Sequence, residues 1–122
     1  MNLRRPPDVA SLRAAVWTAK ALRLAKRQLG EGDDYRALDL PAPPPVPATA
    51  SRGVNAVLRR SRATCLVEAS VRQRWLAAHG EPRDLVIGVK PPAEGFAAHA
   101  WLEGDPESNA TGFTELTRVP AR

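Results

Sequence analysis

The chain has 122 residues, of which 43% are apolar, so it suits one small domain with a modest core. Aromatic residues make up 5% of the chain, too few for the stacking platforms that bind single-stranded nucleic acid. The single cysteine excludes a disulfide within the chain and is typical of a reducing compartment, so we expect a cytoplasmic protein.

The formal net charge of +5 is concentrated near the N-terminus. Residues 1–30 carry seven basic side chains and one acidic side chain, whereas the rest of the chain carries eleven basic and twelve acidic. A basic nucleic-acid-binding face spread over the whole fold is therefore not expected. No apolar run reaches the length of a signal peptide core or of a transmembrane helix.

A helix is predicted from about Asp8 to Leu29, because Asp8 can cap its start and Gly30 can end it. Large apolar residues are expected to lie along one side of this helix, namely Val9, Leu12, Val16, Ala19, Leu22 and Leu29. Three interpretations stay open for it: a helix packed on the domain, a docking surface for an acidic partner, or a helix that rests on a membrane.

Residues 31–53 predict an extended connection. Acidic residues come first, and the five prolines from Pro41 to Pro47 then favour a polyproline-like spacer. We therefore divide the chain into a basic amphipathic helix at 1–30, an acidic and then proline-rich linker at 31–53, and a core at 54–122.

A short helix from about Val54 to Arg60 leads to a longer helix that holds the only cysteine, Cys65. Thr64 can cap that longer helix, and Gly80 supplies its stop. Cys65 then lies in the first turn, where unpaired amides and the positive end of the helix dipole favour a thiolate. A cysteine protease or acyl-transfer enzyme needs its nucleophile in such a place, although a lone cysteine is also a common core residue.

After Gly80 the hydrophobic period changes from helix to strand. Strands are predicted over residues 84–90, 96–103 and 113–117, the first two forming an antiparallel hairpin. The predicted fold class is α+β, with N-terminal helices followed by a small antiparallel sheet.

Two histidines are candidate partners for the thiol. His79, at the far end of the cysteine helix, is expected to face solvent, so His99 is the better partner. We place His99 on a central strand of the sheet, sharing a face with Trp101. Cys65 and His99 are then expected to face each other across the helix–sheet interface, in the chain order of papain-like and transglutaminase-like folds.

A more specific resemblance rests on two segments and their spacing. Arg62-Ala-Thr-Cys-Leu-Val67, followed by Leu85-Val-Ile-Gly-Val89 and Phe96-Ala-Ala-His-Ala-Trp-Leu-Glu103, resembles the leader peptidases of bacterial lasso-peptide biosynthesis. These are small transglutaminase-like, papain-like cysteine proteases that form the protease half of the split B protein. The resemblance covers roughly residues 54–118.

The resemblance implies a cysteine peptidase that removes the leader from a ribosomally made lasso precursor peptide. Cys65 would be the nucleophile, His99 would transfer its proton, and backbone amides at the start of the cysteine helix would contribute to the oxyanion hole. The family places an aspartate about a dozen residues after the histidine. Here Asp105 comes sooner and Asn109 lies nearer that distance; we favour Asp105 as the third catalytic residue, and Asn109 stays open.

The resemblance also implies partners. They are the precursor peptide, a recognition protein that binds its leader, and a separate ATP-dependent cyclase, with no metal or organic cofactor and no nucleic acid. Two other classes of function stay open: another thiol acyl-transfer enzyme, such as an amidase or a transglutaminase, and a non-catalytic basic binding module with Cys65 in its core.

Overall fold

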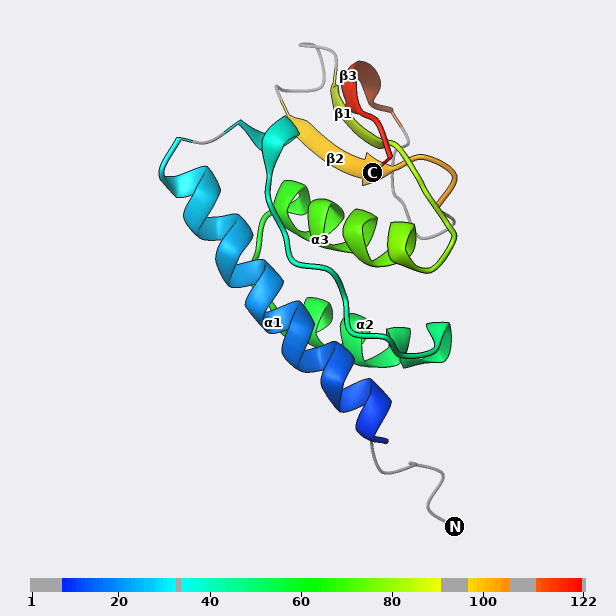
Figure 1. The fold of residues 1–122 in the computed structure, drawn as a ribbon. Coiled ribbons are helices and arrows are strands. Elements are labelled where there is room, and N and C mark those ends of the chain that lie inside the picture. The colour runs from blue at the N-terminus through cyan, green and yellow to red at the C-terminus, as the bar shows by residue number, and fades with distance from the viewer. Residues whose placement is uncertain (1–7, 33, 91–96, 106–111, 122) are drawn as a thin grey trace.

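The computed structural model describes residues 8–32, 34–90, 97–105 and 112–121. In these residues three helices are followed by a three-stranded antiparallel sheet, and α3 lies between the sheet and the other two helices (Figure 1). The elements are α1 (Val9–Gly30), η1 (Tyr35–Ala37), η2 (Ala48–Ala50), α2 (Ser51–Arg60), α3 (Cys65–Ala78), β1 (Leu85–Val89), β2 (Ala98–Leu102) and β3 (Thr114–Val119). The predicted α+β fold class is confirmed.

Helix α1 begins where the sequence predicted, because the Asp8 carboxylate accepts a hydrogen bond from the Ser11 amide at 2.6 Å. Its buried face is different from the expected one. The buried residues are mostly small: Ser11, Ala14, Trp17, Thr18, Ala21, Leu22 and Ala25. Val9, Leu12 and Val16 are instead 73%, 50% and 70% exposed, so this part of the predicted apolar side does not pack on the domain.

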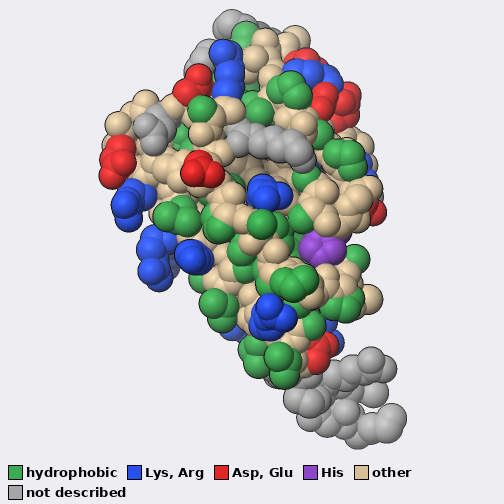
Figure 2. Space-filling model, in the orientation of Figure 1, with side chains coloured by type: hydrophobic (Ala, Val, Ile, Leu, Met, Phe, Trp, Pro, Cys, Tyr) green, Lys and Arg blue, Asp and Glu red, His purple; other side chains and the backbone are tan. Residues whose placement is uncertain are grey.

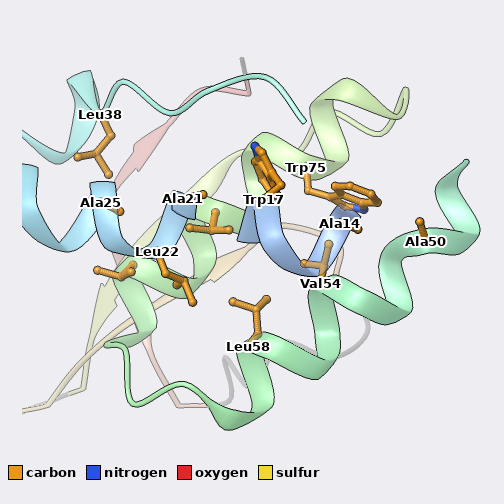
Figure 3. Packing of buried hydrophobic residues seen from close by; sticks show 12 residues of the cluster. Ala14, Trp17, Ala21, Leu22, Ala25, Leu38, Ala50, Val54, Leu58 and Trp75 are labelled. Atoms are coloured by element: carbon orange, nitrogen blue, oxygen red, sulfur yellow. The ribbon is translucent and has the colours of Figure 1, made fainter. Parts of the chain in front are cut away.

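Close packing of α1 on α2 explains this choice of face. A Cβ atom at Gly53 in α2 would clash with the backbone carbonyl of Ser11, so the two helix backbones nearly touch there. Only small side chains fit at such a crossing, and Ala14 lies beside Val54 within this interface, while Leu58 lies near Leu22 (Figure 3). The same cluster extends to Trp75 of α3, which joins all three helices into one core.

The proline-rich strap, which we define as residues 38–47, is extended but packs on the helices. Leu38 is buried, and the indole nitrogen of Trp17 donates to the carbonyl of Pro41 at 3.1 Å. At the other end of the strap, Nε2 of His79 lies 3.0 Å from the carbonyl oxygen of Val46. The strap therefore runs across α1 and α3, and α1 is part of the packed domain and is not separated from it (Figure 1).

His79 is held in this arrangement by contacts on three sides. Its Nδ1 lies 2.8 Å from the carbonyl oxygen of Trp75, and the two rings are 4.0 Å apart. His79, which was expected to face solvent, is half-buried, because the strap contacts it at the end of α3.

In the sheet, β1 is the central strand and the order is β2-β1-β3. The hairpin of β1 and β2 is confirmed, with Gly88 opposite His99. The expectation that His99 lies on a central strand is wrong, because β3 pairs with the far side of β1 and leaves β2 at the edge.

One arginine forms ion pairs with carboxylates from all three strand regions of the sheet. Arg118 of β3 forms ion pairs with Asp84, Glu103 and Glu115. The pKa of Asp84 is lowered, first by the hydrogen bond from the Ala121 amide and then by Arg118. In the described part of the chain, no helix is both long and apolar enough to cross a membrane.

Candidate active site

Cys65 is the first residue of α3, as the sequence predicted. Thr64 caps the helix through its hydroxyl, which accepts a hydrogen bond from the Val67 amide at 3.3 Å. The first amides of a helix have no acceptor within it, so those of Cys65 and Leu66 remain as donors beside the thiol. The helix start therefore offers both a positive dipole end and N–H groups not used within the helix to charge that develops near Cys65.

A backbone amide of the sheet contacts the thiol directly. The Ala100 amide of β2 donates to Cys65 Sγ at 3.3 Å. In the hairpin, the Lys90 amide donates to the Ala97 carbonyl, and the Glu103 amide donates to the Asp84 carbonyl. Backbone groups alternate in direction along a strand, so the odd-numbered residues of β2 bond to β1 and the amide of Ala100 points away from it. At the edge of the described sheet, β2 thus supplies a hydrogen-bond donor that in a central strand would pair with the neighbouring strand.

This contact places the thiol next to His99 in the chain. Since the Ala100 nitrogen is bonded to the carbonyl carbon of His99, covalent geometry puts the His99 Cα within about 6 Å of Sγ. The half-buried sulfur also packs against the cluster between α3 and the sheet.

The His99 ring lies on the other face of the sheet. Ala100 and Leu102 pack against α3, so alternation turns His99 and Trp101 away from it. The centroid of the His99 ring is 5.8 Å from that of Trp101 and 5.2 Å from that of Phe113. The two side chains therefore do not face each other across the helix–sheet interface as expected, and the described contacts of the two residues include no Cys65–His99 hydrogen bond.

Asp105 lies beyond the end of β2, where its amide donates to the Leu102 carbonyl at 3.2 Å. Its carboxylate forms an ion pair with Arg72 at 3.0 Å, and the Asp105 side chain is 11% exposed. Arg72 is two turns along α3 from Cys65, about 10 Å at the usual helical rise. The catalytic role of Asp105 stays a prediction that this contact does not favour, and Asn109 lies outside the described residues.

Sequence reasoning missed the amide of Ala100, because a backbone donor carries no residue-type signal. It predicted that Trp101 shares a face with His99, but it missed Phe113, whose ring contacts both and lies 5.0 Å from Lys90 Nζ. The period-two pattern around His99 was the available signal for Trp101. Within the described residues, no cluster of three or more His, Cys, Asp or Glu side chains could hold a metal ion.

Comparison with known families agrees with this arrangement of a cysteine helix followed by a small antiparallel sheet. Residues 5–118 match the family model described as the transglutaminase-like superfamily. The chain belongs to the transglutaminase-like superfamily. Members of this superfamily are typically cysteine peptidases or acyl-transfer enzymes, so Cys65 has the residue type that such chemistry uses. No curated protein and no solved structure matches the chain.

Proposed function

We propose that this transglutaminase-like protein is a cysteine peptidase that removes the leader from a ribosomally made lasso precursor peptide. One observation carries the proposal: Cys65 starts α3, and the amide one peptide bond from His99 donates to its sulfur. The segments around Cys65 and His99, which resemble the leader peptidases, support the choice of substrate.

The reaction begins with proton transfer from the Cys65 thiol to His99. This transfer requires the His99 ring to leave its contacts with Trp101 and Phe113 and to turn round the edge of β2 toward Sγ. The thiolate then attacks the carbonyl carbon at the leader–core junction, and the oxygen of that carbonyl takes up negative charge. We expect the amides of Cys65 and Leu66, at the start of α3, to stabilise this charge.

The peptide C–N bond then breaks, and His99 gives its proton to the leaving amine of the core peptide. The leader remains on Cys65 as a thioester. Water attacks this thioester, His99 accepts a proton from the water, and the leader leaves as a free acid while the thiol is restored. This sequence needs no metal or organic cofactor.

The partners belong to the same proposal. A separate recognition protein binds the leader and presents the precursor, and an ATP-dependent cyclase then closes the ring of the released core. We place the reaction in the cytoplasm. Asp105 and Asn109 are the two candidates for the residue that orients His99.

Cleavage of the precursor encoded beside this chain, presented by its recognition protein, tests the proposal. Mass spectrometry should find two products whose summed mass exceeds that of the precursor by one water. Cys65→Ala and His99→Ala should abolish cleavage with unchanged circular dichroism, whereas His79→Gln should retain it. Cleavage by the Cys65→Ala variant would refute the proposed nucleophile.

Acyl transfer is the second candidate, because the superfamily also contains acyl-transfer enzymes. A product that carries the mass of an added amine in place of water would identify a transferase. Absence of any turnover by the wild-type protein, with intact binding of the precursor complex, would identify a non-catalytic binding module.

A further inference from the structure

The first half of α1 presents a large apolar surface that the fold leaves uncovered. Val9, Leu12 and Val16 are 73%, 50% and 70% exposed, and successive members of this set are three or four residues apart. Residues at this spacing share one side of a helix, so the three side chains form a continuous apolar stripe.

This stripe forms one wall of a groove. The opposite wall is the proline-rich strap, which contributes Pro41, Ala42 and Pro44, and the groove holds about 460 Å³. Trp17 lines it between the two walls and is fixed there, because its indole nitrogen donates to the Pro41 carbonyl. The size is that of a pocket for one or two large side chains, and both walls are held by the core.

The groove is bordered by positive charge. Arg13 and Lys20 line it, and among the described residues no ion pair neutralises either of them. Over the lower part of α1, hydrophobic side chains surround a basic one (Figure 2). An occupant therefore gains most if apolar side chains enter the groove while carboxylates flank them.

We propose that this groove, which we call the α1 groove, binds an acidic amphipathic helix of a partner protein. Such a helix carries apolar residues three and four positions apart, which fit the stripe, and glutamates or aspartates beside them, which pair with Arg13 and Lys20. The two basic residues disfavour pairing with the basic α1 of a second copy. The proposal concerns a surface formed by α1 and the strap and does not depend on the chemistry of Cys65.

The test uses a defined probe and the full-length Cys65→Ala protein, so that binding is measured apart from any reaction. The probe is a fluorescently labelled helical peptide with leucines along one face and glutamates on both flanks. It should bind with an affinity that falls as salt rises. A matched peptide with lysines in place of the glutamates should bind at least about tenfold more weakly.

Variants locate the site. Val16→Ser and Leu12→Ser should each weaken binding about tenfold, since each removes apolar area from the contact. Leu116→Ser is the matched control, because Leu116 is 68% exposed on β3, and it should bind as the parent does. Circular dichroism should be the same for all three, because each changed residue is exposed.

Several results would overturn the proposal. They are failure of the glutamate peptide to bind, equal affinities for the glutamate and lysine peptides, and an affinity that Val16→Ser does not weaken. Binding to phosphatidylglycerol vesicles that Val16→Ser abolishes would assign the groove to a membrane instead. A dimer in sedimentation velocity that Val16→Ser dissociates would assign it to a second copy.

Discussion

At the residue scale, the candidate nucleophile Cys65 is contacted by one backbone amide of the sheet, that of Ala100. A capping threonine, a helical period and a terminal glycine sufficed to place Cys65 at a helix start, because all three signals are local. The contact from Ala100 depends on which strand lies at the edge of the sheet, which no local pattern reports. The position of the His99 ring depends on the same question, since alternation fixes which residues share a face but not which face meets α3.

The first prediction concerns the amide of Ala100. Ala100→Pro removes the only donor of that residue without removing a bond to β1, so it should slow alkylation of Cys65 by iodoacetamide. A hydrogen bond to a charged group contributes about 1.5–3 kcal/mol, so the rate at neutral pH should fall by about tenfold or more. Cys65 is the only cysteine, so mass spectrometry follows it without interference.

Ala98→Pro is the matched control for that experiment. Ala98 lies two residues away on the same strand and is exposed, and its amide also points away from β1. The control should react as fast as the wild type. Equal rates for Ala98→Pro and Ala100→Pro would show that the amide of Ala100 does not activate the thiol.

The second prediction separates structure from catalysis at Asp105. Its ion pair with Arg72 is largely buried on the aspartate side, so Asp105→Ala should lower the free energy of unfolding by about 1–3 kcal/mol. Arg72→Gln should destabilise the protein similarly, and the double variant should cost less than the sum of the two. Urea denaturation measures all three.

Precursor cleavage by the same variants decides the third catalytic residue. If Asp105 only joins β2 to α3, the maximal rate of Asp105→Ala equals that of Arg72→Gln at a temperature where both are folded. A maximal rate lost in Asp105→Ala alone would instead make Asp105 the residue that orients His99. A rate lost in Asn109→Ala would give that role to Asn109.

At the element scale, the helices and strands were predicted well and their packing was not. The bounds of α1, the hairpin and the third strand follow from caps, glycines and period. The buried face of α1 does not, because the period predicts which apolar residues share a side but not which side meets α2. Small residues become the packed face only when the neighbouring helix brings a glycine to the crossing, which is a pairwise property of α1 and α2.

The third prediction tests that crossing. Gly53→Ala should force α1 and α2 apart, because the new methyl group would clash with the Ser11 carbonyl and crowd the amide of Ala15. We expect a loss of about 1–3 kcal/mol in the free energy of unfolding, the usual cost of overpacking. Gly30→Ala is the matched control at the end of α1, where nothing lies within 4 Å of the added atom. It should be neutral or slightly stabilising, and an equal loss at both glycines would contradict the tight crossing.

At the scale of the whole molecule, the strap packs on α1 and α3, and α1 packs on the domain, as one of the three interpretations of its sequence held. Prolines at the predicted positions do give an extended chain, but the carbonyls of that chain accept hydrogen bonds from Trp17 and contact His79. A proline-rich composition predicts that a segment is extended, but it does not predict whether that segment packs on helices elsewhere in the chain. The exposed residues of α1 therefore form two surfaces. One is the apolar α1 groove, and the other is a basic surface nearer the C-terminal end of the helix.

The last prediction concerns that basic surface and the proposed precursor complex. Arg23 and Lys26 are exposed and line a second groove of about 470 Å³, between α1 and α2, together with Arg60. Docking onto a partner that already holds the leader would raise the local concentration of substrate, and positive charge would steer an acidic partner toward this surface. Reversing Arg23 and Lys26 to glutamate should therefore raise KM for the presented precursor about tenfold at low salt, with little change in kcat.

The variant with glutamine at both positions should have an intermediate KM. The KM of the wild type should rise with ionic strength, because salt screens exposed charges. Equal KM values for the wild-type and glutamate proteins at low salt would remove this surface from the reaction. A lower kcat at unchanged KM would show that the substitutions act on the chemical step and not on docking.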